Sequence, residues 1–395
     1  MENIIVFKNG VETLSFFSEQ LAFAYEKMGY EVFQFDLQEE ESSYKKLTDF
    51  CEKGNNIVIS FNFDGLRGEE SLYDADGELY WKKMNIPCIN IMVDHPFYYH
   101  ELLEKVEREL GMNLYYQVSI DGDHEKYMHR FFSQVRNITF LPLAGTEYGG
   151  YNKKERSYEV VFTGNYTPPK NFRKYIERID EEYTKFYDGI IEDLINNPDT
   201  PMEIAFEKHL CREMGELSEK DLMVCMGNMI FIDLYVRFYF RGEIVRCLAE
   251  AGIKVHVFGA GWDMLECNAS ENIIKEGPTD SKGCLIALSN AKISLNVMPW
   301  FKQGAHDRVY NSMLNGSVVV TDESEFLKVD LKNDENVVFY SLKEYEKLPD
   351  KIKLLLNNDE KRNKLAENGY LHTKKYHTWE KRAKALMDFL KENRK

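Results

Sequence analysis

The sequence predicts an α/β protein built from two doubly wound parallel sheets, and three observations lead to this prediction. The chain has 395 residues, more than one hydrophobic core of ordinary size accommodates, so two domains are expected. Short apolar runs alternate with amphipathic stretches in the N-terminal third, and this alternation returns after residue 250. Strands and helices repeated in this order are typical of parallel sheets covered by helices.

The first domain, residues 1–155, contains a series of strand-like runs. Between the first two, Leu14, Phe17 and Leu21 recur at roughly helical spacing, which indicates a helix connecting two parallel strands. The strand-like runs are Ile4–Phe7, Glu31–Phe35, Asn56–Ser60, Cys88–Val93, Tyr115–Ser119 and Ile138–Leu141.

The second domain, residues 156–375, begins with a strand at Glu159–Thr163 and is then interrupted by a helical insertion, residues 168–239. The strands resume at Val255–Gly259, Ile293–Val297, Ser317–Thr321 and Val337–Tyr340, and residues 376–395 read as a last amphipathic helix. Ligands of such sheets bind at the carboxyl ends of the strands. We therefore expect the site in a cleft between the two domains, lined by these loops.

Composition and charge exclude several classes of partner. The formal net charge is -16, which argues against a nucleic-acid groove or an anionic membrane surface. The seven cysteines are scattered without CxxC spacing, so neither a disulfide framework nor a zinc site is expected. The N-terminus lacks a cationic start and a long apolar core, and no run has the length of a transmembrane segment. The expected location is the cytoplasm.

The stretch HDRVYNSMLNGSVVVTD, residues 306–322, carries the strongest functional indication. Its second half reads as a buried strand, and its first half begins a helix with His306, Asp307 and Arg308. A helix N-terminus is already positive, so a cation there indicates a bound anion, and the guanidinium fork matches a phosphate. The alternatives are a surface ion pair for Arg308 and a capping or core role for His306.

Other strand ends of the second domain supply further candidates for binding a phosphate or nucleotide. Glycines after strands allow a close backbone approach, and the polar neighbours supply hydrogen bonds. Trp262 could stack on a base or belong to the core. The spacing of the glycines lacks the full dinucleotide pattern, so no nicotinamide cofactor is expected. These candidates are Gly164, Asn165, Gly259, Gly261, Trp262 and Asn296.

In the first domain, Asp94 and His95 follow the strand Cys88–Val93. A carboxylate or imidazole at a strand end could deprotonate an acceptor hydroxyl, with Asp94 the first candidate and His95 its rival. The alternative for Asp94 is a helix cap. Asp121 and His124 follow the next strand and are candidates for the acceptor side, with an ordinary cap at Asp123 as the alternative. His100 and His124 could be metal ligands, but no third ligand lies at a defined spacing from them, so no metal site is expected.

Several of these motifs together resemble the bacterial glycosyltransferases related to the spore-maturation protein CgeB. They include Gly164-Asn-Tyr, Phe258-Gly-Ala-Gly-Trp262, Ser289–Asn296, His306-Asp-Arg-Val309, Leu314-Asn-Gly316, Val319-Val-Thr-Asp322 and His377-Thr-Trp379. The resemblance implies a GT-B fold of two Rossmann-like domains facing a cleft. It further implies a nucleotide-sugar donor bound by the C-terminal domain, an acceptor bound by the N-terminal domain, no bound metal or cofactor, and a last helix that returns to the N-terminal domain.

One departure from the resemblance concerns stereochemistry. Many retaining GT-B enzymes carry two glutamates at the positions occupied here by Gln303 and Asn311. Asn311 can still bond a ribose hydroxyl, although more weakly than a carboxylate. The change favours inversion, with a base from the N-terminal domain.

The leading interpretation is therefore a metal-independent glycosyltransferase that moves a sugar from a nucleoside diphosphate, with uridine expected, to a hydroxyl or similar nucleophile. The acceptor, whether a glycan, a protein or a small molecule, is not specified by the sequence. A nucleotide-sugar epimerase and a non-catalytic glycosyltransferase-like scaffold remain alternatives. The helical insertion could serve as an acceptor platform, a homodimer surface or a lid.

Overall fold

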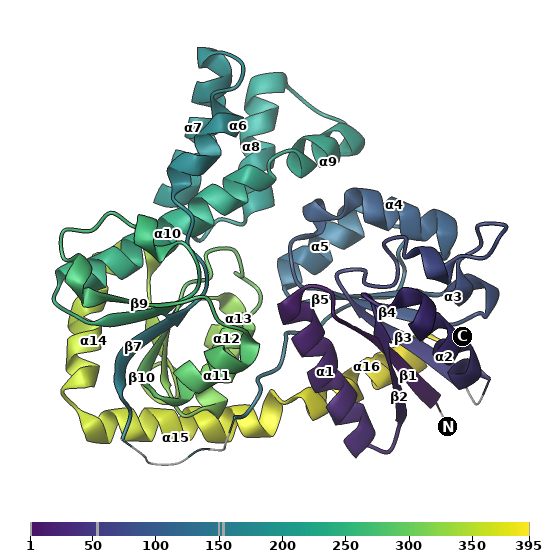
Figure 1. The fold of residues 1–395 in the computed structure, drawn as a ribbon. Helices are drawn as coiled ribbons and strands as arrows, with labels where there is room; N and C mark the ends of the chain where they lie inside the picture. The colour runs from purple at the N-terminus through teal and green to yellow at the C-terminus, as the bar shows by residue number, and fades with distance from the viewer. Residues whose placement is uncertain (1, 53–54, 149–150, 152–154, 395) are drawn as a thin grey trace. The chain divides into compact units, whose positions relative to one another are not determined.

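The computed structural model describes residues 2–52, 55–148, 151 and 155–394, which form two compact units (Figure 1). Unit 1 consists of Met1–Ala144 and Thr378–Lys395, and unit 2 of Gly145–His377. Each unit is a parallel sheet with helices on its faces, so the predicted fold class is confirmed.

Unit 1 carries its parallel strands in the order β2-β1-β3-β4-β5-β6 among the described residues. The order reverses between β1 and β3, so the loops after these strands diverge at a topological switch point. Strands β4 and β5 are buried at every residue, as expected when helices cover both faces of a parallel sheet. The elements are β1 (Glu2–Lys8), α1 (Glu12–Lys27), β2 (Glu31–Asp36), α2 (Glu40–Cys51), β3 (Asn55–Phe61), α3 (Tyr80–Lys83), β4 (Cys88–Met92), α4 (His100–Glu109), β5 (Tyr115–Ser119), α5 (Gly122–Phe131), β6 (Ile138–Phe140) and α16 (Trp379–Asn393).

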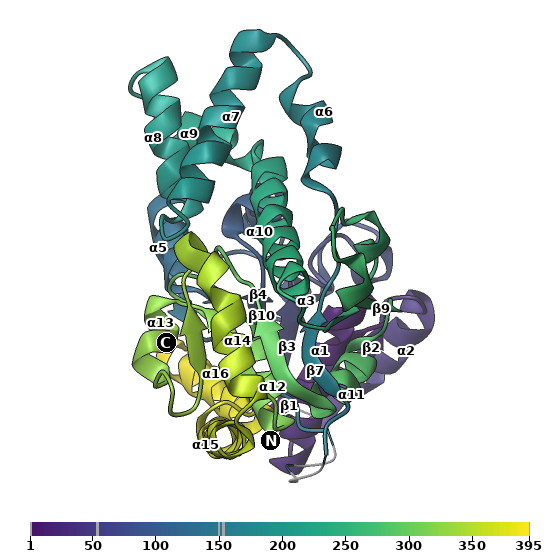
Figure 2. The ribbon, with the colours of Figure 1, turned by 90° about the vertical axis from the view of Figure 1, so that its left-hand side faces the viewer.

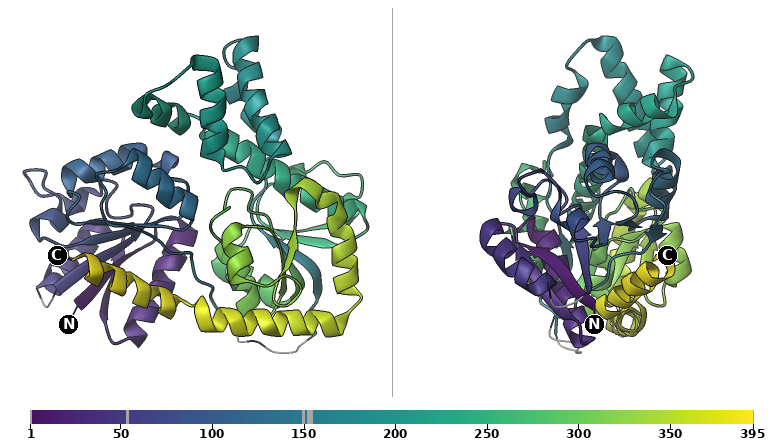
Figure 3. Two further views of the ribbon diagram at one scale, coloured as in Figure 1. Left: turned by 180° about the vertical axis from the view of Figure 1, so that it is seen from behind. Right: turned by 90° about the vertical axis from the view of Figure 1, so that its right-hand side faces the viewer.

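The last helix, α16, packs against α1 within unit 1 (Figure 3). Trp379 at its first turn is 5% exposed, and its ring centroid lies 5.6 Å from that of Phe17 and 6.4 Å from that of Phe61. The hydroxyl of Tyr25 donates to the carbonyl of Ala383 at 3.2 Å. The C-terminal segment therefore completes the core of unit 1.

We expect Trp379→Ala to lower the free energy of unfolding by about 3–5 kcal/mol, because it empties a buried aromatic site. Chemical denaturation followed by circular dichroism measures this change. The exposed Lys391 of the same helix provides the control, since Lys391→Ala should change stability by no more than about 0.5 kcal/mol. Equal stability of Trp379→Ala and wild type would show that α16 is dispensable for unit 1.

Unit 2 carries its parallel strands in the order β12-β11-β10-β7-β8-β9 within the ranges described. The reversal lies between β7 and β10, so the loops after these two strands diverge there. Helices α11 and α12 cover one face of the sheet, and α10 and α14 the other (Figure 1). The elements are β7 (Tyr158–Thr163), α6 (Arg173–Ile176), α7 (Glu181–Asn196), α8 (Met202–Met214), α9 (Glu219–Gly227), α10 (Ile230–Glu250), β8 (Val255–Phe258), β9 (Ile273–Gly277), α11 (Ser281–Ser289), β10 (Ala291–Asn296), α12 (Asp307–Leu314), β11 (Val318–Asp322), α13 (Glu325–Asp330), β12 (Val338–Tyr340), α14 (Leu348–Leu356) and α15 (Asp359–Tyr376).

The helical insertion differs from its predicted bounds at its C-terminal end. Helices α7 and α8 lie side by side and extend away from the sheet of unit 2 (Figure 2). The predicted end, Tyr239, lies inside α10, which continues to Glu250 because its buried face, including Phe240, Ile244 and Leu248, runs on without a break. Helix α10 is thus also the crossover helix that leads into β8.

The boundary between the units also differs from the predicted one, since it follows Ala144 and not residue 155. Side chains of α12 and the residue after it hold this stretch in unit 2. Asn311 accepts a hydrogen bond from the backbone N–H of Thr146 at 2.7 Å, and Asn315 accepts one from that of Tyr148 at 2.8 Å. Because these hydrogen bonds join residues far apart in the chain, no local sequence pattern indicates the boundary.

Two further findings concern single elements. Strand β9 is not among the predicted strands; it is an edge strand whose run IIKEG carries two charged residues. In the part of the chain that the structure describes, no single helix has the length and apolar character to cross a membrane. Helices α9 and α10 pass that test only as a pair bent by 50°.

Candidate active site

Arg308 lies at the switch point of the sheet in unit 2. It belongs to the first turn of α12, and its guanidinium reaches across the ends of the two central strands. Its Nε donates to the hydroxyl of Thr163 in β7 at 3.0 Å, and one terminal nitrogen donates to the amide oxygen of Asn296 in β10 at 2.8 Å. The carboxyl ends of β7 and β10 therefore position this side chain where doubly wound sheets bind ligands.

The charge of Arg308 is buried, and the residues that the structure describes give it no ion pair. The residue is 7% exposed, and no carboxylate of the described residues lies within 4.0 Å of its guanidinium. Burial lowers its pKa, and the more distant charges of Asp307 and Asp322 only partly offset this effect. A buried cation bound to neutral groups alone is costly, so the arrangement favours an anionic ligand.

A second guanidinium, that of Arg241 from α10, lies close to the first. One of its terminal nitrogens donates to the carbonyl of Asn165 at 3.1 Å. Both guanidinium carbons lie over the ring of Phe162, at 5.9 Å for Arg241 and 5.1 Å for Arg308. Burial, together with the charge of Arg308, lowers the pKa of Arg241 well below its ordinary value. Two cations held this close match the charge of a diphosphate.

Arg241 does not stand out in the sequence. Its helix also contains Arg237 and Arg246, and both of these form ion pairs with residues of the same helix, Asp233 and Glu243. No carboxylate of the described residues lies at ion-pair distance from Arg241. Such a difference between neighbouring arginines appears only in the tertiary structure.

His306 is the N-cap of α12 and shares the site with Arg308. Its Nδ1 lies 2.8 Å from a carboxylate oxygen of Asp307 and 3.3 Å from the backbone nitrogen of Arg308. Burial lowers the pKa of His306, and the positive charge of Arg308 adds to this effect. The Nε2 atom makes no hydrogen bond to the described residues, so it is available to a ligand.

The glycine-containing loops after β7 and β8 pack closely against each other. A Cβ atom on Gly259 would collide with the carbonyl group of Gly164, and one on Gly261 would collide with the carbonyl oxygen of Tyr166. The indole N–H of Trp262 donates to the Gly164 carbonyl at 2.8 Å, and Trp262 is 2% exposed. Trp262 is therefore a core residue that braces the loop after β7, and base stacking by this ring is not supported.

The asparagines predicted to bind the donor are already hydrogen-bonded. The amide of Asn296 bonds Arg308 through its oxygen and Thr321 through its nitrogen at 2.9 Å, so it positions the arginine. The amide of Asn311 bonds Thr146 and Asp307, the latter at 2.8 Å. Asn165 is exposed, and its side-chain oxygen accepts from the backbone of Ala260 at 2.9 Å.

In unit 1, Asp94 follows β4 as predicted. One of its carboxylate oxygens accepts hydrogen bonds from the amide of Asn62 at 3.0 Å and from the hydroxyl of Tyr99 at 2.7 Å. The side chain is partly exposed and caps no helix in the structure. Asp94 is thus held in a fixed orientation at the carboxyl end of the sheet, and it remains a candidate for contact with an acceptor.

The other predicted residues of unit 1 have structural roles. His95 is 6% exposed, its Nδ1 accepts from the backbone of Phe97 at 3.2 Å, and its ring lies 4.6 Å from that of His124. Burial lowers the pKa of His95 well below its ordinary value. Asp121 is fully buried and caps α5 through the N–H of Asp123 at 2.7 Å. His95, Asp121 and His124 therefore do not form an accessible acceptor site, because the aromatic core of α5 encloses them.

Asp64, which the sequence analysis missed, lies after β3 at the switch point of unit 1. Burial raises its pKa to about 6, although the charge of Arg67, 3.6 Å away, lowers it. Neither carboxylate oxygen accepts a hydrogen bond from the described residues. Arg67 also bonds the carbonyl of Asn62, whose side chain holds Asp94, so the two carboxylates belong to one network. A carboxyl with this pKa is suited to proton transfer near neutral pH.

One group of residues in unit 2 has the composition of a metal site. Asp330, His372 and His377 bring together a carboxylate and two imidazoles, whose ligand atoms lie within 4.8 Å of one another. The histidines considered in the sequence analysis, His100 and His124, are not part of it.

Comparison with known proteins agrees with this architecture. Residues 241–388, which include Arg241 and Arg308, match the model of a family described as glycosyl transferase-like. No curated protein matches the chain by sequence.

Among solved structures, HepE from Anabaena, solved in complex with UDP-glucose, aligns with a TM-score of 0.54 and 10% identity over 99% of this chain and 100% of HepE. Sucrose-phosphate synthase from Thermosynechococcus elongatus aligns with a TM-score of 0.53 and 10% identity over 99% of this chain and 98% of the synthase. BGT of phage T4, in complex with its UDP-glucose substrate, aligns with a TM-score of 0.53 and 12% identity over 100% of this chain and 99% of BGT. The chain spans 58% of TarM, a longer protein, with a TM-score of 0.45 and 12% identity over 88% of this chain. The chain therefore has the two-domain GT-B fold, and its C-terminal part matches a glycosyl transferase-like family.

Proposed function

We propose that the protein is a glycosyltransferase that takes a sugar from a nucleoside diphosphate sugar bound by unit 2. The observation that carries this proposal is the buried guanidinium of Arg308 at the switch point of the sheet, where its hydrogen-bond partners among the described residues are neutral. A diphosphate supplies the missing negative charge. The match to a glycosyl transferase-like family and the GT-B fold support the same class of activity.

The arginines explain how unit 2 would assist the reaction. Breaking the bond between the sugar and the diphosphate builds negative charge on the leaving oxygen. Arg308 and Arg241 are already fixed by Thr163, Asn296 and Asn165, so little reorganisation is needed to stabilise this charge. The two guanidinium groups place positive charge where other enzymes use a divalent cation, and we propose that donor binding is independent of added metal.

For the acceptor side, we propose that Asp64 of unit 1 deprotonates the acceptor hydroxyl. Its pKa of about 6 lets it be ionised at neutral pH while remaining basic enough to accept a proton. Asp94, the first candidate from the sequence, would orient the acceptor through its remaining carboxylate oxygen. A general base in unit 1, together with the amide side chains of Gln303 and Asn311, supports transfer with inversion at the anomeric carbon.

The nucleotide is proposed to be a uridine diphosphate. HepE and phage T4 BGT, which share the fold, were solved with UDP-glucose. Hexosyl transfer to a hydroxyl of a glycan, a protein or a small molecule would fit this donor.

A thermal-shift screen tests the proposal. The purified protein is heated with nucleoside diphosphates and sugar nucleotides, each with and without EDTA, and every sample is compared with a nucleotide-free sample in the same buffer. A ligand present at 100 times its Kd should add about 2.7 kcal/mol of stability, and we expect UDP or a UDP-sugar to do so in EDTA. If no nucleotide at millimolar concentration raises the Tm, the donor assignment is wrong.

A further inference from the structure

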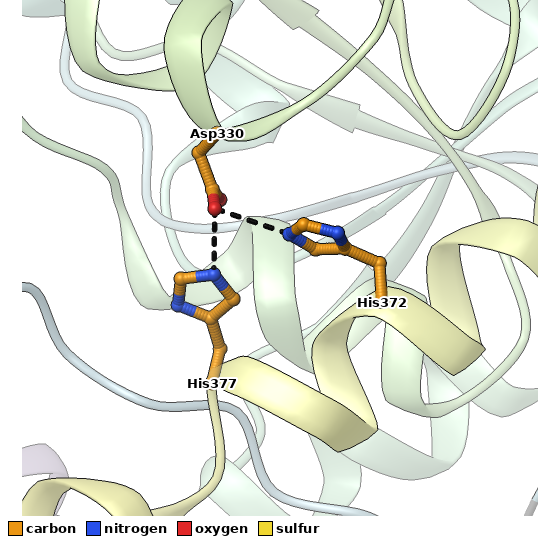
Figure 4. Close-up of side chains that lie close together, drawn as sticks. All are labelled: Asp330, His372 and His377. Carbon is orange, nitrogen blue, oxygen red and sulfur yellow. Dashed lines mark hydrogen bonds and ion pairs between the residues drawn. The ribbon is translucent and has the colours of Figure 1, made fainter.

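Three side chains of unit 2 converge on one point, although they are distant in the sequence. The Nε2 atoms of His372 and His377 lie 3.1 and 3.0 Å from the same carboxylate oxygen of Asp330, as Figure 4 shows. Asp330 is the last residue of α13, His372 lies in the last turns of α15, and His377 is the residue that ends α15. They are 42 and 47 residues apart from Asp330 in the chain, so no local spacing reveals the group.

We propose that Asp330, His372 and His377 bind a divalent transition metal ion, with Zn²⁺ as the best match. Two imidazole nitrogens and one carboxylate oxygen are ligands that Zn²⁺ accepts in proteins, and a fourth position would be left for water. The three ligand atoms lie within 4.8 Å of one another. Zinc bonds of about 2.0–2.2 Å require ligand atoms roughly 3.4 Å apart, so small rotations of these side chains would complete the site.

The neighbours of the group support its use as a metal site. The hydroxyl of Tyr310 donates to the other carboxylate oxygen of Asp330 at 3.1 Å, which fixes the carboxylate. The ring of His377 stacks on that of Tyr310 with centroids 4.0 Å apart and an angle of 8° between planes. Metal ligands are commonly oriented by such second-layer hydrogen bonds and packing.

The exposure of the group gives an ion a route of entry. The side chain of His377 is 7% exposed and that of Asp330 14%, whereas the side chain of His372 is 18% exposed. The site is therefore sheltered on the His377 side and open to water near His372.

The proposed site is distinct from the donor site and would have a structural role. Arg308 and Tyr310 are two positions apart in α12, so they leave the helix in nearly opposite directions. The metal would join α13, the end of α15 and, through Tyr310, α12. Of these elements, α15 ends immediately before Thr378, where the chain enters unit 1.

The alternative is a group held only by hydrogen bonds, in which both imidazoles donate to Asp330. Metal titration separates the two. The protein is prepared without a polyhistidine tag, treated with chelator, dialysed against Zn²⁺ in the presence of a reductant, and assayed by elemental analysis. We expect one equivalent of zinc per chain in wild type, its loss in His372→Ala, and its retention in His129→Ala, which removes an exposed histidine of α5.

Two further measurements keep the test decisive. Asp330→Asn keeps a hydrogen-bond acceptor for the histidines but removes the charged ligand, so it should also lose the bound zinc while its circular dichroism spectrum stays native. Tyr310→Phe keeps the ring beside His377 and should weaken the Kd for Zn²⁺ by about 10–100-fold.

Cobalt substitution identifies the ligands, because the chain also has free cysteines. With Co²⁺ we expect visible ligand-field bands without the near-ultraviolet band of a thiolate ligand. Zinc binding equal in wild type, His372→Ala and Asp330→Asn, or no binding by wild type, would overturn the proposal. A thiolate band that survives in both variants would do so as well.

Discussion

Arg308→Ala should raise the Kd of the nucleoside diphosphate by about 10–100-fold, because a charge-assisted hydrogen bond contributes about 1.5–3 kcal/mol. The effect on kcat/KM should be larger, about 10²–10³-fold, since charge on the leaving diphosphate increases in the transition state. Isothermal titration with the nucleotide found in the thermal-shift screen measures the first quantity, and initial rates of sugar transfer measure the second.

Two control variants make this result specific. Arg108 lies in α4 of unit 1 with its side chain 65% exposed, so Arg108→Ala removes the same charge elsewhere and should change neither quantity. Arg308→Lys keeps the charge but loses the planar fork that bonds Thr163 and Asn296, and should fall between wild type and the alanine variant. A Kd unchanged in Arg308→Ala would remove Arg308 from the donor site.

The second large effect is expected at Asp64. We expect Asp64→Asn to lower kcat/KM by about 10²–10⁴-fold, because a positioned general base typically contributes that much. In wild type, kcat/KM should fall tenfold per pH unit below about pH 6, where Asp64 becomes protonated. Asp94→Asn should keep this pH dependence even if it lowers the rate, since it removes an orienting group and not the base. Loss of the acidic limb in Asp94→Asn alone would reverse the two assignments.

The raised pKa of Asp64 also predicts a change in stability with pH, which is independent of activity. Because the folded-state pKa lies near 6 and the ordinary value is 3.8, the folded state binds more protons between these values than the unfolded state. The stability associated with this group is fully present below about pH 4 and is lost as the pH rises through about 6. The difference of about two pKa units corresponds to roughly 3 kcal/mol.

Denaturant unfolding of wild type and Asp64→Asn at pH 4 to 7 measures this effect. Relative to wild type, the variant should gain stability as the pH rises, since its amide cannot ionise. The exposed Asp76 supplies the control, and Asp76→Asn should show no such trend. A constant difference in stability between wild type and Asp64→Asn over this range would show that the pKa of Asp64 is not raised.

Much of the fold could be predicted because parallel sheets have a local pattern. Strands such as β4 and β11 are buried at every residue, so their apolar runs stand out from the amphipathic helices between them. The edge strand β9 was not predicted because two of its five residues are charged. The end of α10 was not predicted because its buried face, and not a change of composition, continues the helix to Glu250.

The candidate site residues likewise fall into those with a local sequence signal and those without one. Arg308 and Asp94 are candidates that the sequence itself indicates, because each stands immediately beside a strand end or helix start, and their roles stay predictions. His95, Asp121 and His124 stand in the same kind of position, and only burial in the aromatic core of α5 shows that they are structural. Arg241, Asp64 and the group around Asp330 have ordinary local sequences, and their chemistry arises from the groups that the fold brings near or keeps away.

The sequence by itself determined the two parallel α/β domains and the position of Arg308 at a helix start, for which we propose anion binding, because hydrophobic periodicity and helix-end chemistry are local properties. The tertiary structure alone decided which polar groups act together. Arg308 bonds Thr163, which is 145 residues away in the chain, and Asp330 bonds His377, which is 47 residues away. Strand order and helix packing bring these pairs together. The pKa of Asp64 likewise depends on burial, which no residue determines from its own neighbours in the chain.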